Sequence, residues 1–258
     1  MRLVGESLPM LDVEGLTKSF GGVRAVQGVT FSVAAGEIVA LIGPNGAGKS
    51  TCFNMLNGQL RPDAGRVMIG GRNSTGLPPR KIARLAVGRT FQVAQTYGSM
   101  TVRENVQMAL IAHRREFFGL WRRASDLHVE EAMALLDKVG MAAQADRSCG
   151  VLAYGDAKRV ELAVALAGEP KLLLMDEPTA GMAPAERTAL MALAAGLARA
   201  QGIAILFTEH DMDVVFTHAE RVLVLDRGRI IAQGDPRTVR ADPAVRAVYL
   251  GSTAPVED

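Results

Sequence analysis

The sequence predicts an α/β fold in which buried strands and helices form a core that carries a helical insert. Short apolar runs at 38–42, 172–175 and 203–208 have the length and composition of buried strands. Apolar residues alternate within the first 33 residues, which predicts an antiparallel β portion at the N-terminal side. The segment from about 93 to 167 is helical in character, so we expect it to form a helical subdomain.

The overall composition is that of a globular protein. Of the 258 residues, 48% are hydrophobic and 22% are charged, which provides enough apolar material for one large domain. The 29 basic and 27 acidic residues leave a net charge of +2. This near balance argues against bulk binding of nucleic acid but leaves room for a local basic patch. Cys52 and Cys149 have no metal-ligand partner at zinc spacing, so we expect ordinary small residues in a reducing cytoplasm.

No part of the sequence indicates export or insertion into a membrane. Residues 1–11 carry Arg2 and Glu6 and no long apolar run, so we expect no signal peptide. No stretch approaches the roughly 18 apolar residues of a membrane helix. We therefore expect a soluble chain that reaches any membrane through partner subunits.

The predicted core leads from antiparallel strands to a glycine-rich loop. Strands are expected at 11–16 and 28–33, with a turn at the glycine pair 21–22. The strand 38–42 ends at a glycine, and residues 52–60, beyond the loop, are predicted as a helix. Strand, glycine-rich loop and helix are the arrangement that a phosphate-binding loop needs.

The later elements divide the chain into core, insert and tail. In the insert, residues 129–139 place apolar side chains along one helical face, and Gly140 follows as a C-cap. The core resumes with a strand at 171–175, a helix at 184–199 and a hairpin around 227–228. The expected parts of this single 258-residue domain are an α/β core at 11–92 and 168–235, the helical subdomain at 93–167, and a C-terminal tail at 236–258 with a short helix and a frayed end.

Residues 43–51 fit the P-loop pattern in full. Backbone N–H groups of such a loop, and of the helix that begins near Lys49, point at phosphate oxygens. The Lys49 ammonium would meet the β- and γ-phosphates of ATP, and the Ser50 hydroxyl would bind Mg²⁺. An ordinary glycine turn is the alternative, and the flanking strand and helix argue against it. The predicted nucleotide-binding residues of the loop are Gly43, Pro44, Asn45, Gly46, Ala47, Gly48, Lys49, Ser50 and Thr51.

Two acids end the apolar strand at 172–175. Asp176 is expected at the carboxyl end of the strand, where α/β sheets bind ligands, and it would hold the Mg²⁺ shell. Glu177 beside it would act as general base on the attacking water. A solvated acidic turn is the alternative for these two residues alone. Together with the P-loop, they predict a nucleoside triphosphatase.

The order of the remaining motifs resembles the ATP-binding subunits of ABC transporters over residues 11–251. The resemblance implies that Phe20 stacks on adenine as the aromatic loop, a core phenylalanine being the alternative. It implies that Gln92, in the run Arg-Thr-Phe-Gln, contacts Mg²⁺ and the attacking water and senses the transmembrane partner. It also identifies His210 as the switch histidine that donates a hydrogen bond to the γ-phosphate, and residues 180–182 as the D-loop.

The segment 152–156 resembles the signature motif of this family, with departures. The family form is Leu-Ser-Gly-Gly-Gln; here Ala153 replaces the serine, Tyr154 the first glycine and Asp156 the glutamine, while Gly155 is kept. In the family this helix N-terminus covers the γ-phosphate bound by the opposite subunit, and its dipole survives the changes. Asp156, however, brings a negative charge toward a phosphate, which it would repel unless a cation or the helix N-terminus compensates.

Several details resemble the ATPases of branched-chain amino-acid importers. They are the Leu-Ala-Tyr-Gly signature, the run 101–106, the stretch 113–126 and the ending 242–251. Related urea and amide importers and the ATPase of the lipopolysaccharide exporter share much of this pattern. Residues 113–123 mix basic side chains with three aromatics, which suits anionic lipid headgroups or a membrane subunit. A loop that packs its aromatics locally is the alternative, and nucleic-acid binding is disfavoured by the net charge.

The resemblance implies a catalytic role for Glu177, His210 and Gln92, with ATP and Mg²⁺ as cofactors. Two ATPs would lie between two ATP-binding subunits, identical or similar, and closure of this pair would move transmembrane permease subunits. A solute-binding protein would take part indirectly, and the chain would sit at the cytoplasmic face of the membrane. A soluble ABC ATPase without a transport role is the rival, disfavoured by the single short cassette. A module that binds ATP without turnover is disfavoured by the intact Lys49 and Glu177.

Overall fold

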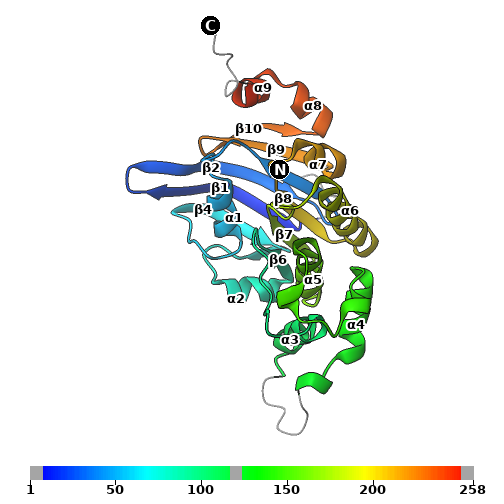
Figure 1. Ribbon diagram of the computed structural model, residues 1–258. Coiled ribbons are helices and arrows are strands. Elements are labelled where there is room, and N and C mark those ends of the chain that lie inside the picture. The colour runs from blue at the N-terminus through cyan, green and yellow to red at the C-terminus, as the bar shows by residue number, and fades with distance from the viewer. Residues whose placement is uncertain (1–7, 117–123, 251–258) are drawn as a thin grey trace.

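The computed structural model describes residues 8–116 and 124–250 and contains two sheets (Figure 1). The six-stranded sheet has the order β10-β9-β3-β8-β7-β6, and the four-stranded sheet has the order β2-β1-β4-β5. The strands are β1 Leu11–Phe20, β2 Val23–Val33, β3 Ile38–Ile42, β4 Ala64–Ile69, β5 Arg72–Asn73, β6 Val87–Thr90, β7 Leu172–Asp176, β8 Ala204–Thr208, β9 Arg221–Asp226 and β10 Arg229–Gly234. The predicted α/β fold with an antiparallel portion and helical segments is confirmed.

The six-stranded sheet separates two hydrophobic cores. Along β3, Ile38, Ala40 and Ile42 face one core and Val39 and Leu41 face the other, as the two-residue period of a strand requires. The first core is closed by helices, and the second by the four-stranded sheet and α1. Both cysteines are free and buried, as ordinary small residues can be, and burial raises the pKa of the Cys52 thiol to about 12.

The observed elements differ from the sequence-based expectation in three ways. Helix α1, Lys49–Leu56, begins three residues before the expected 52 because the left-handed Gly48 leads directly into it, and it ends before the left-handed Gly58. The strands β1 and β2 are longer than predicted because register shifts interrupt the alternation without ending the pairing. The short strands β4, β5 and β6 were not predicted.

The helices after β6 pack on one another at one end of the molecule (Figure 1). They are α3 Val102–Arg114, α4 Val129–Lys138 and α5 Tyr154–Leu166, with the short α2 Pro79–Ile82 before β6. The predicted apolar face of α4 is buried at Ala132 and Leu136, and Gly140 follows it in a left-handed conformation. That residues 93–167 act as a separate subdomain stays a prediction.

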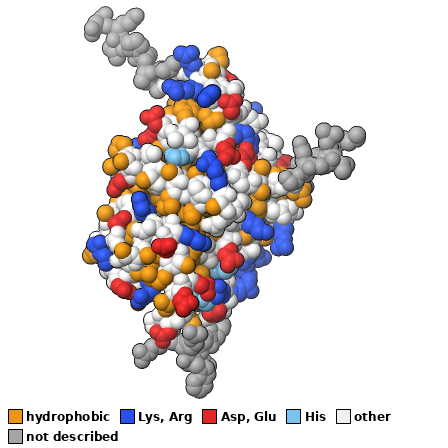
Figure 2. Space-filling view, turned by 90° about the vertical axis from the view of Figure 1, so that its right-hand side faces the viewer, with side chains coloured by type: hydrophobic (Ala, Val, Ile, Leu, Met, Phe, Trp, Pro, Cys, Tyr) orange, Lys and Arg blue, Asp and Glu red, His pale blue; other side chains and the backbone are white. Residues whose placement is uncertain are grey.

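The remaining helices contribute to the same hydrophobic core as α3, α4 and α5, so they cover the same face of the six-stranded sheet. They are α6 Pro184–Gln201, α7 Met212–His218, α8 Pro236–Ala241 and α9 Pro243–Leu250. The tail therefore holds two short helices, because Pro243 begins a second one; the polar end at 252–258 lies outside the described residues. None of the described helices is both long and apolar enough to cross a membrane. On the face seen in Figure 2, basic and acidic side chains are interspersed.

Helix α3 begins with a capping box whose loss should destabilise the fold. Thr101 Oγ1 accepts a hydrogen bond from the Glu104 backbone, and the Glu104 carboxylate accepts one from the Thr101 backbone. We expect Thr101→Ala to lower the free energy of unfolding by about 1 kcal/mol in urea denaturation. The control Thr188→Ala, on the exposed face of α6, should change it by less than about 0.5 kcal/mol. Equal losses in the two variants would contradict the capping role.

Candidate functional site

The candidate site lies where the carboxyl ends of three parallel strands meet. Leu41 of β3 pairs with Thr208 of β8, and Asp176 of β7 pairs with the same Thr208. This register places the loop after β3 beside the two acids that follow β7. The predicted phosphate loop and the predicted catalytic acids, which are far apart in sequence, are thereby brought together.

The phosphate loop needs its glycines because neighbouring strands pass close to it. A Cβ atom on Gly48, at φ 105°, would lie 2.4 Å from the carbonyl oxygen of Ala25 in β2. A Cβ atom on Gly43 would lie 2.1 Å from the carbonyl oxygen of Leu225 in β9. Only glycine fits at both positions, and the loop's N–H groups are held at the start of α1.

Lys49 lies folded into the loop. Its ammonium donates hydrogen bonds to the carbonyl oxygens of Gly43, at 2.7 Å, and Pro44, at 3.1 Å. Burial lowers its pKa, while the charges of Glu177 and Asp176 oppose that shift. A cation held between loop carbonyls and two carboxylates is well placed to meet phosphate oxygens.

A cavity of about 200 Å³ opens over the loop. It joins the P-loop to Glu177 and His210, and it is also bordered by Ala25 of β2. The residues that line it are Ala25, Asn45, Gly46, Ala47, Gly48, Lys49, Ser50, Thr51, Glu177 and His210. Of the predicted loop residues, Gly43 and Pro44 lie beneath this cavity as the acceptors of the Lys49 hydrogen bonds.

The Glu177 carboxylate is held between the two other predicted catalytic residues. Gln92 Nε2 donates to one carboxylate oxygen at 2.8 Å, and His210 Nε2 lies 2.8 Å from the other. The Glu177 backbone has φ 45°, a left-handed conformation that costs a non-glycine residue about 1–3 kcal/mol. The three residues come from the segment after β6, the end of β7 and the end of β8, so the fold alone brings them together.

Asp176 has the surroundings of a magnesium ligand. Its Oδ1 accepts a hydrogen bond from Thr208 Oγ1 at 2.8 Å, and its Oδ2 lies 3.9 Å from Arg89 Nη2. The described residues contain no cluster of three or more histidines, cysteines or acids that could hold a metal. Carboxylate and hydroxyl oxygens such as those of Asp176 and Ser50 suit Mg²⁺ that is held jointly with phosphates and water, which needs no cage of protein ligands.

The signature residues lie outside this cavity. Ala153 is the N-cap of α5, Gly155 is buried against Glu186, and the Tyr154 hydroxyl donates to the Gln92 carbonyl oxygen at 2.8 Å. None of 153–156 is among the residues that line the phosphate cavity. The same chain therefore does not bring its signature to its own phosphate loop.

Asp156 is engaged within its own chain. Its Oδ2 accepts a hydrogen bond from Gln144 Nε2 at 3.1 Å, and Gln144 in turn accepts one from Arg147. It also lies in the first turn of α5, where the helix dipole favours a carboxylate. Lys158, which could have been expected to offset its charge, is instead buried and bonded to Phe91 and Glu161.

Two motifs have weaker structural support. Phe20 ends β1 at the tip of the first hairpin, is 49% exposed, and is not among the residues that line the cavity. Its stacking on adenine stays a prediction. The D-loop segment 180–182 follows Thr179, whose hydroxyl and backbone donate to the buried Glu209.

Four further residues, which were not predicted from the sequence, shape the site. Thr208 bonds both Asp176 and Glu177, Arg89 approaches Asp176, and Lys158 and Glu161 bond the backbone around Gln92. A polar residue that ends an apolar strand was a signal for Thr208. Lys158 and Glu161, opposite charges three residues apart at the start of the apolar part of α5, were a signal for the buried pair.

Comparisons with known proteins agree with this geometry. A family model described as ABC transporter matches residues 26–180, and one described as branched-chain amino acid ATP-binding cassette transporter matches residues 229–255. The branched-chain amino acid transport ATP-binding protein BraF of Pseudomonas aeruginosa is 40% identical over 252 residues, which cover 95% of this chain and 99% of BraF. LivG of Escherichia coli, named likewise, is 39% identical over 255 residues, with 95% and 99% covered.

Solved structures give the same result. The ADP conformation of MJ1267, an ATP-binding cassette of an ABC transporter, superposes with a TM-score of 0.85 at 34% identity, and 95% of this chain and 100% of that chain are covered. A nucleotide-free ATP-binding cassette from an ABC transporter gives a TM-score of 0.84 at 34% identity, with 94% and 99% covered. With a model match over more than half of its length and relatives aligned along nearly all of both chains, this chain belongs to the ABC transporter family as one of its ATP-binding cassettes.

Proposed function

We propose that this chain is the ATP-hydrolysing subunit that powers an importer of branched-chain amino acids. The observation that carries the proposal is the Glu177 carboxylate, held by Gln92 and His210 beside the phosphate loop. The C-terminal match at 229–255 and the relatives BraF and LivG favour branched-chain amino acids over the urea, amide and lipopolysaccharide alternatives. The same relatives favour a transport role over a soluble ATPase.

The site residues divide the work of ATP hydrolysis. Backbone N–H groups of the P-loop and the Lys49 ammonium bind the β- and γ-phosphates, and Ser50 and Asp176 would hold Mg²⁺, which neutralises developing charge. Glu177 accepts a proton from the water that attacks the γ-phosphorus, as the bond to the leaving ADP oxygen breaks. Gln92 orients that water, and His210 donates a hydrogen bond to the γ-phosphate. Inorganic phosphate and ADP are the products.

The position of the signature supports a paired arrangement. Residues 153–156 begin α5 away from the phosphate cavity of their own chain, so an ATP that they contact belongs to a second ATP-binding subunit, identical or similar. The free N–H groups at the start of α5 would face that ATP, as helix N-termini face phosphates elsewhere. Closure of the pair over two ATPs then brings α5 of each subunit toward the P-loop of the other.

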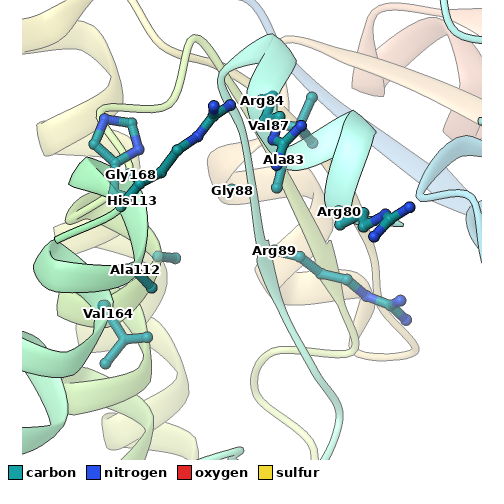
Figure 3. Close-up of a pocket in the computed structure, with 13 residues that line it drawn as sticks. Arg80, Ala83, Arg84, Val87, Gly88, Arg89, Ala112, His113, Val164 and Gly168 are labelled. Carbon is teal, nitrogen blue, oxygen red and sulfur yellow. The ribbon is translucent and has the colours of Figure 1, made fainter. Parts of the chain in front are cut away.

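A second cavity offers the docking site for the permease. It has a volume of about 680 Å³ and opens between α2 and β6 on one side and α3 and α5 on the other (Figure 3). Basic side chains border an apolar floor that includes Ala109, Ala112 and Val164. The basic residues are Arg80, Arg84, Arg89, His113 and Arg115. We propose that this groove receives a permease segment with apolar side chains and a carboxylate, which also anchors the chain at the cytoplasmic face of the membrane.

Arg89 connects this groove to the ATP site. It lines the groove, its guanidinium stacks 4.3 Å from the Phe91 ring centroid, and it lies 3.9 Å from Asp176. Its buried Nε has no hydrogen-bond partner within the described residues. Of the basic-aromatic stretch, the structure describes only 113–116: His113 and Arg115 line the groove, and Arg114 pairs with Glu131. The aromatics of that stretch lie outside the described residues.

The catalytic assignment predicts that Glu177→Gln keeps ATP binding but lowers turnover by about two orders of magnitude or more, the scale of a general base. Phosphate release and binding of labelled ATP by the purified chain measure the two effects. Glu220→Gln is the matched control, because Glu220 adjoins the opposite end of β3 through the Ile38 backbone. Near-normal turnover in Glu177→Gln would overturn the assignment.

The in-chain hydrogen bond of Asp156 predicts that Asp156→Gln leaves ATP-driven pairing unchanged or strengthens it. The carboxylate is bonded to Gln144, so its removal takes away a negative charge but no contact with the partner. Light scattering of the Glu177→Gln background with ATP, with and without the second change, measures the dimer. Gln144→Ala should also leave the dimer intact. Loss of the dimer in Asp156→Gln would show that Asp156 contacts the partner favourably.

The groove assignment predicts that Arg84→Glu weakens co-purification with the permease from native membranes by about tenfold or more, because like charges repel a docked carboxylate. The melting temperature of the isolated subunit should stay within a few degrees. Arg72→Glu, an exposed charge reversal in the four-stranded sheet, is the control. Equal retention of permease by both variants would place the docking site elsewhere.

A further inference from the structure

Helix α5 carries a buried ion pair that the proposed chemistry does not use. Lys158 and Glu161 are each 2% exposed and lie three residues apart on the helix, with Lys158 Nζ 3.2 Å from Glu161 Oε2. Burying two charges is costly unless the remaining hydrogen-bonding capacity is satisfied. The partners that satisfy it therefore indicate what the pair holds in place.

Those partners are backbone groups of the segment around Gln92. Glu161 Oε1 accepts hydrogen bonds from the Phe91 N–H at 3.0 Å and the Gln95 N–H at 3.2 Å. Lys158 Nζ donates to the Phe91 carbonyl oxygen. Burial raises the pKa of Glu161, while Lys158 and the backbone N–H groups favour its charged form. The Lys158 and Glu161 side chains thus bind the backbone C=O and N–H of Phe91, and Glu161 also binds the backbone N–H of Gln95.

A third hydrogen bond completes the contact. The Tyr154 hydroxyl, in the first turn of α5, donates to the Gln92 carbonyl oxygen at 2.8 Å. The Gln92 side chain in turn donates to Glu177 at 2.8 Å. The backbone before and after Gln92 is hydrogen-bonded to α5. Between α5 and the Glu177 carboxylate, only the Gln92 side chain is therefore left without a direct bond to the helix.

We propose that Lys158 and Glu161 are positioning residues that tie Gln92 to helix α5. The start of α5 carries the signature, which would contact the ATP held by the partner subunit. That contact would fix the position of α5 and, through it, the positions of Gln92 and Glu177 in this chain's own site. This inference rests on the proposed function, in which two chains pair over two ATPs. Each chain would then hydrolyse its ATP at full rate only when its signature is engaged.

The test replaces the pair by apolar side chains of similar size, Lys158→Met with Glu161→Leu. Such replacements of buried ion pairs are often tolerated by the fold, whereas loss of one partner is not. The double variant is compared in the wild-type and Gln92→Ala backgrounds. Its matched control, Glu37→Leu with Arg221→Met, removes the ion pair between the start of β9 and the residue before β3, at the edge of the sheet opposite the ATP site.

The expected loss in kcat is about tenfold or more, because small displacements of orienting groups have large rate effects. The affinity of the monomer for ATP should stay unchanged, since Lys49 and the loop are untouched. The Hill coefficient for ATP, which the two sites of a pair allow to exceed 1 in the wild type, should fall toward 1 in the double variant. In the Gln92→Ala background, the double variant should cause no further loss of kcat. Both changes remove the oriented Gln92 side chain from the site, so their effects should not add.

An equal loss of kcat in both backgrounds, or a Hill coefficient the same as that of the wild type, would overturn the proposal. If the double variant does not melt cooperatively, Tyr154→Phe takes its place in the same comparison, with a loss of about fivefold expected for one hydrogen bond. A wild-type chain without ATPase activity would instead refute the proposed function. The two failures are therefore distinguishable.

Discussion

The side-chain hydroxyl of Thr208 joins the two strand ends on which the site depends. It accepts a hydrogen bond from the Glu177 backbone at 3.0 Å and donates one to the Asp176 carboxylate at 2.8 Å. One group thereby fixes the direction in which the chain leaves β7 and the rotation of the first acid. The left-handed backbone of Glu177 costs free energy, and this hydrogen bond is one of the contacts that offset it. The adjacent acids consequently have different partners: the Asp176 carboxylate faces Thr208 and Arg89, and the Glu177 carboxylate faces Gln92 and His210.

The P-loop pattern at 43–51 is specified locally, so it can be recognised in the sequence without knowledge of the fold. Its glycines are required by the close approach of Ala25 and Leu225, and the helix after it begins within the motif itself. Asp176 and Glu177 were equally predictable, because an apolar strand that ends in acids has few other meanings beside a P-loop. The bounds of α1 were wrong at both ends, since left-handed glycines rather than apolar periodicity set them.

Gln92 shows where sequence reasoning needed the fold. Nothing near Gln92 in the chain explains its position, which depends on Lys158 and Glu161 more than sixty residues later. The same holds for Asp156: the family pattern indicated an unfavourable charge, but the structure gives it a partner in Gln144 that no spacing rule predicts. Non-local hydrogen bonds of this kind leave little trace in a single sequence. Phe20 shows the opposite case. The family motif indicated it as a site residue, but it is not among the residues that line the cavity.

The contacts of α5 with the segment 91–95 also explain how binding at the surface can affect the Glu177 carboxylate through few residues. Helix α5 has 13 residues, begins at the exposed Tyr154 after its N-cap Ala153, and is packed against α3 and α6. The segment 91–95 contributes little to either hydrophobic core and takes its position from its bonds to α5. On its other side, Arg89 lines the basic groove and approaches Asp176. Contacts made by a second ATP-binding subunit at α5 and by a permease at the groove would therefore meet at the same few residues, one from each side of Gln92.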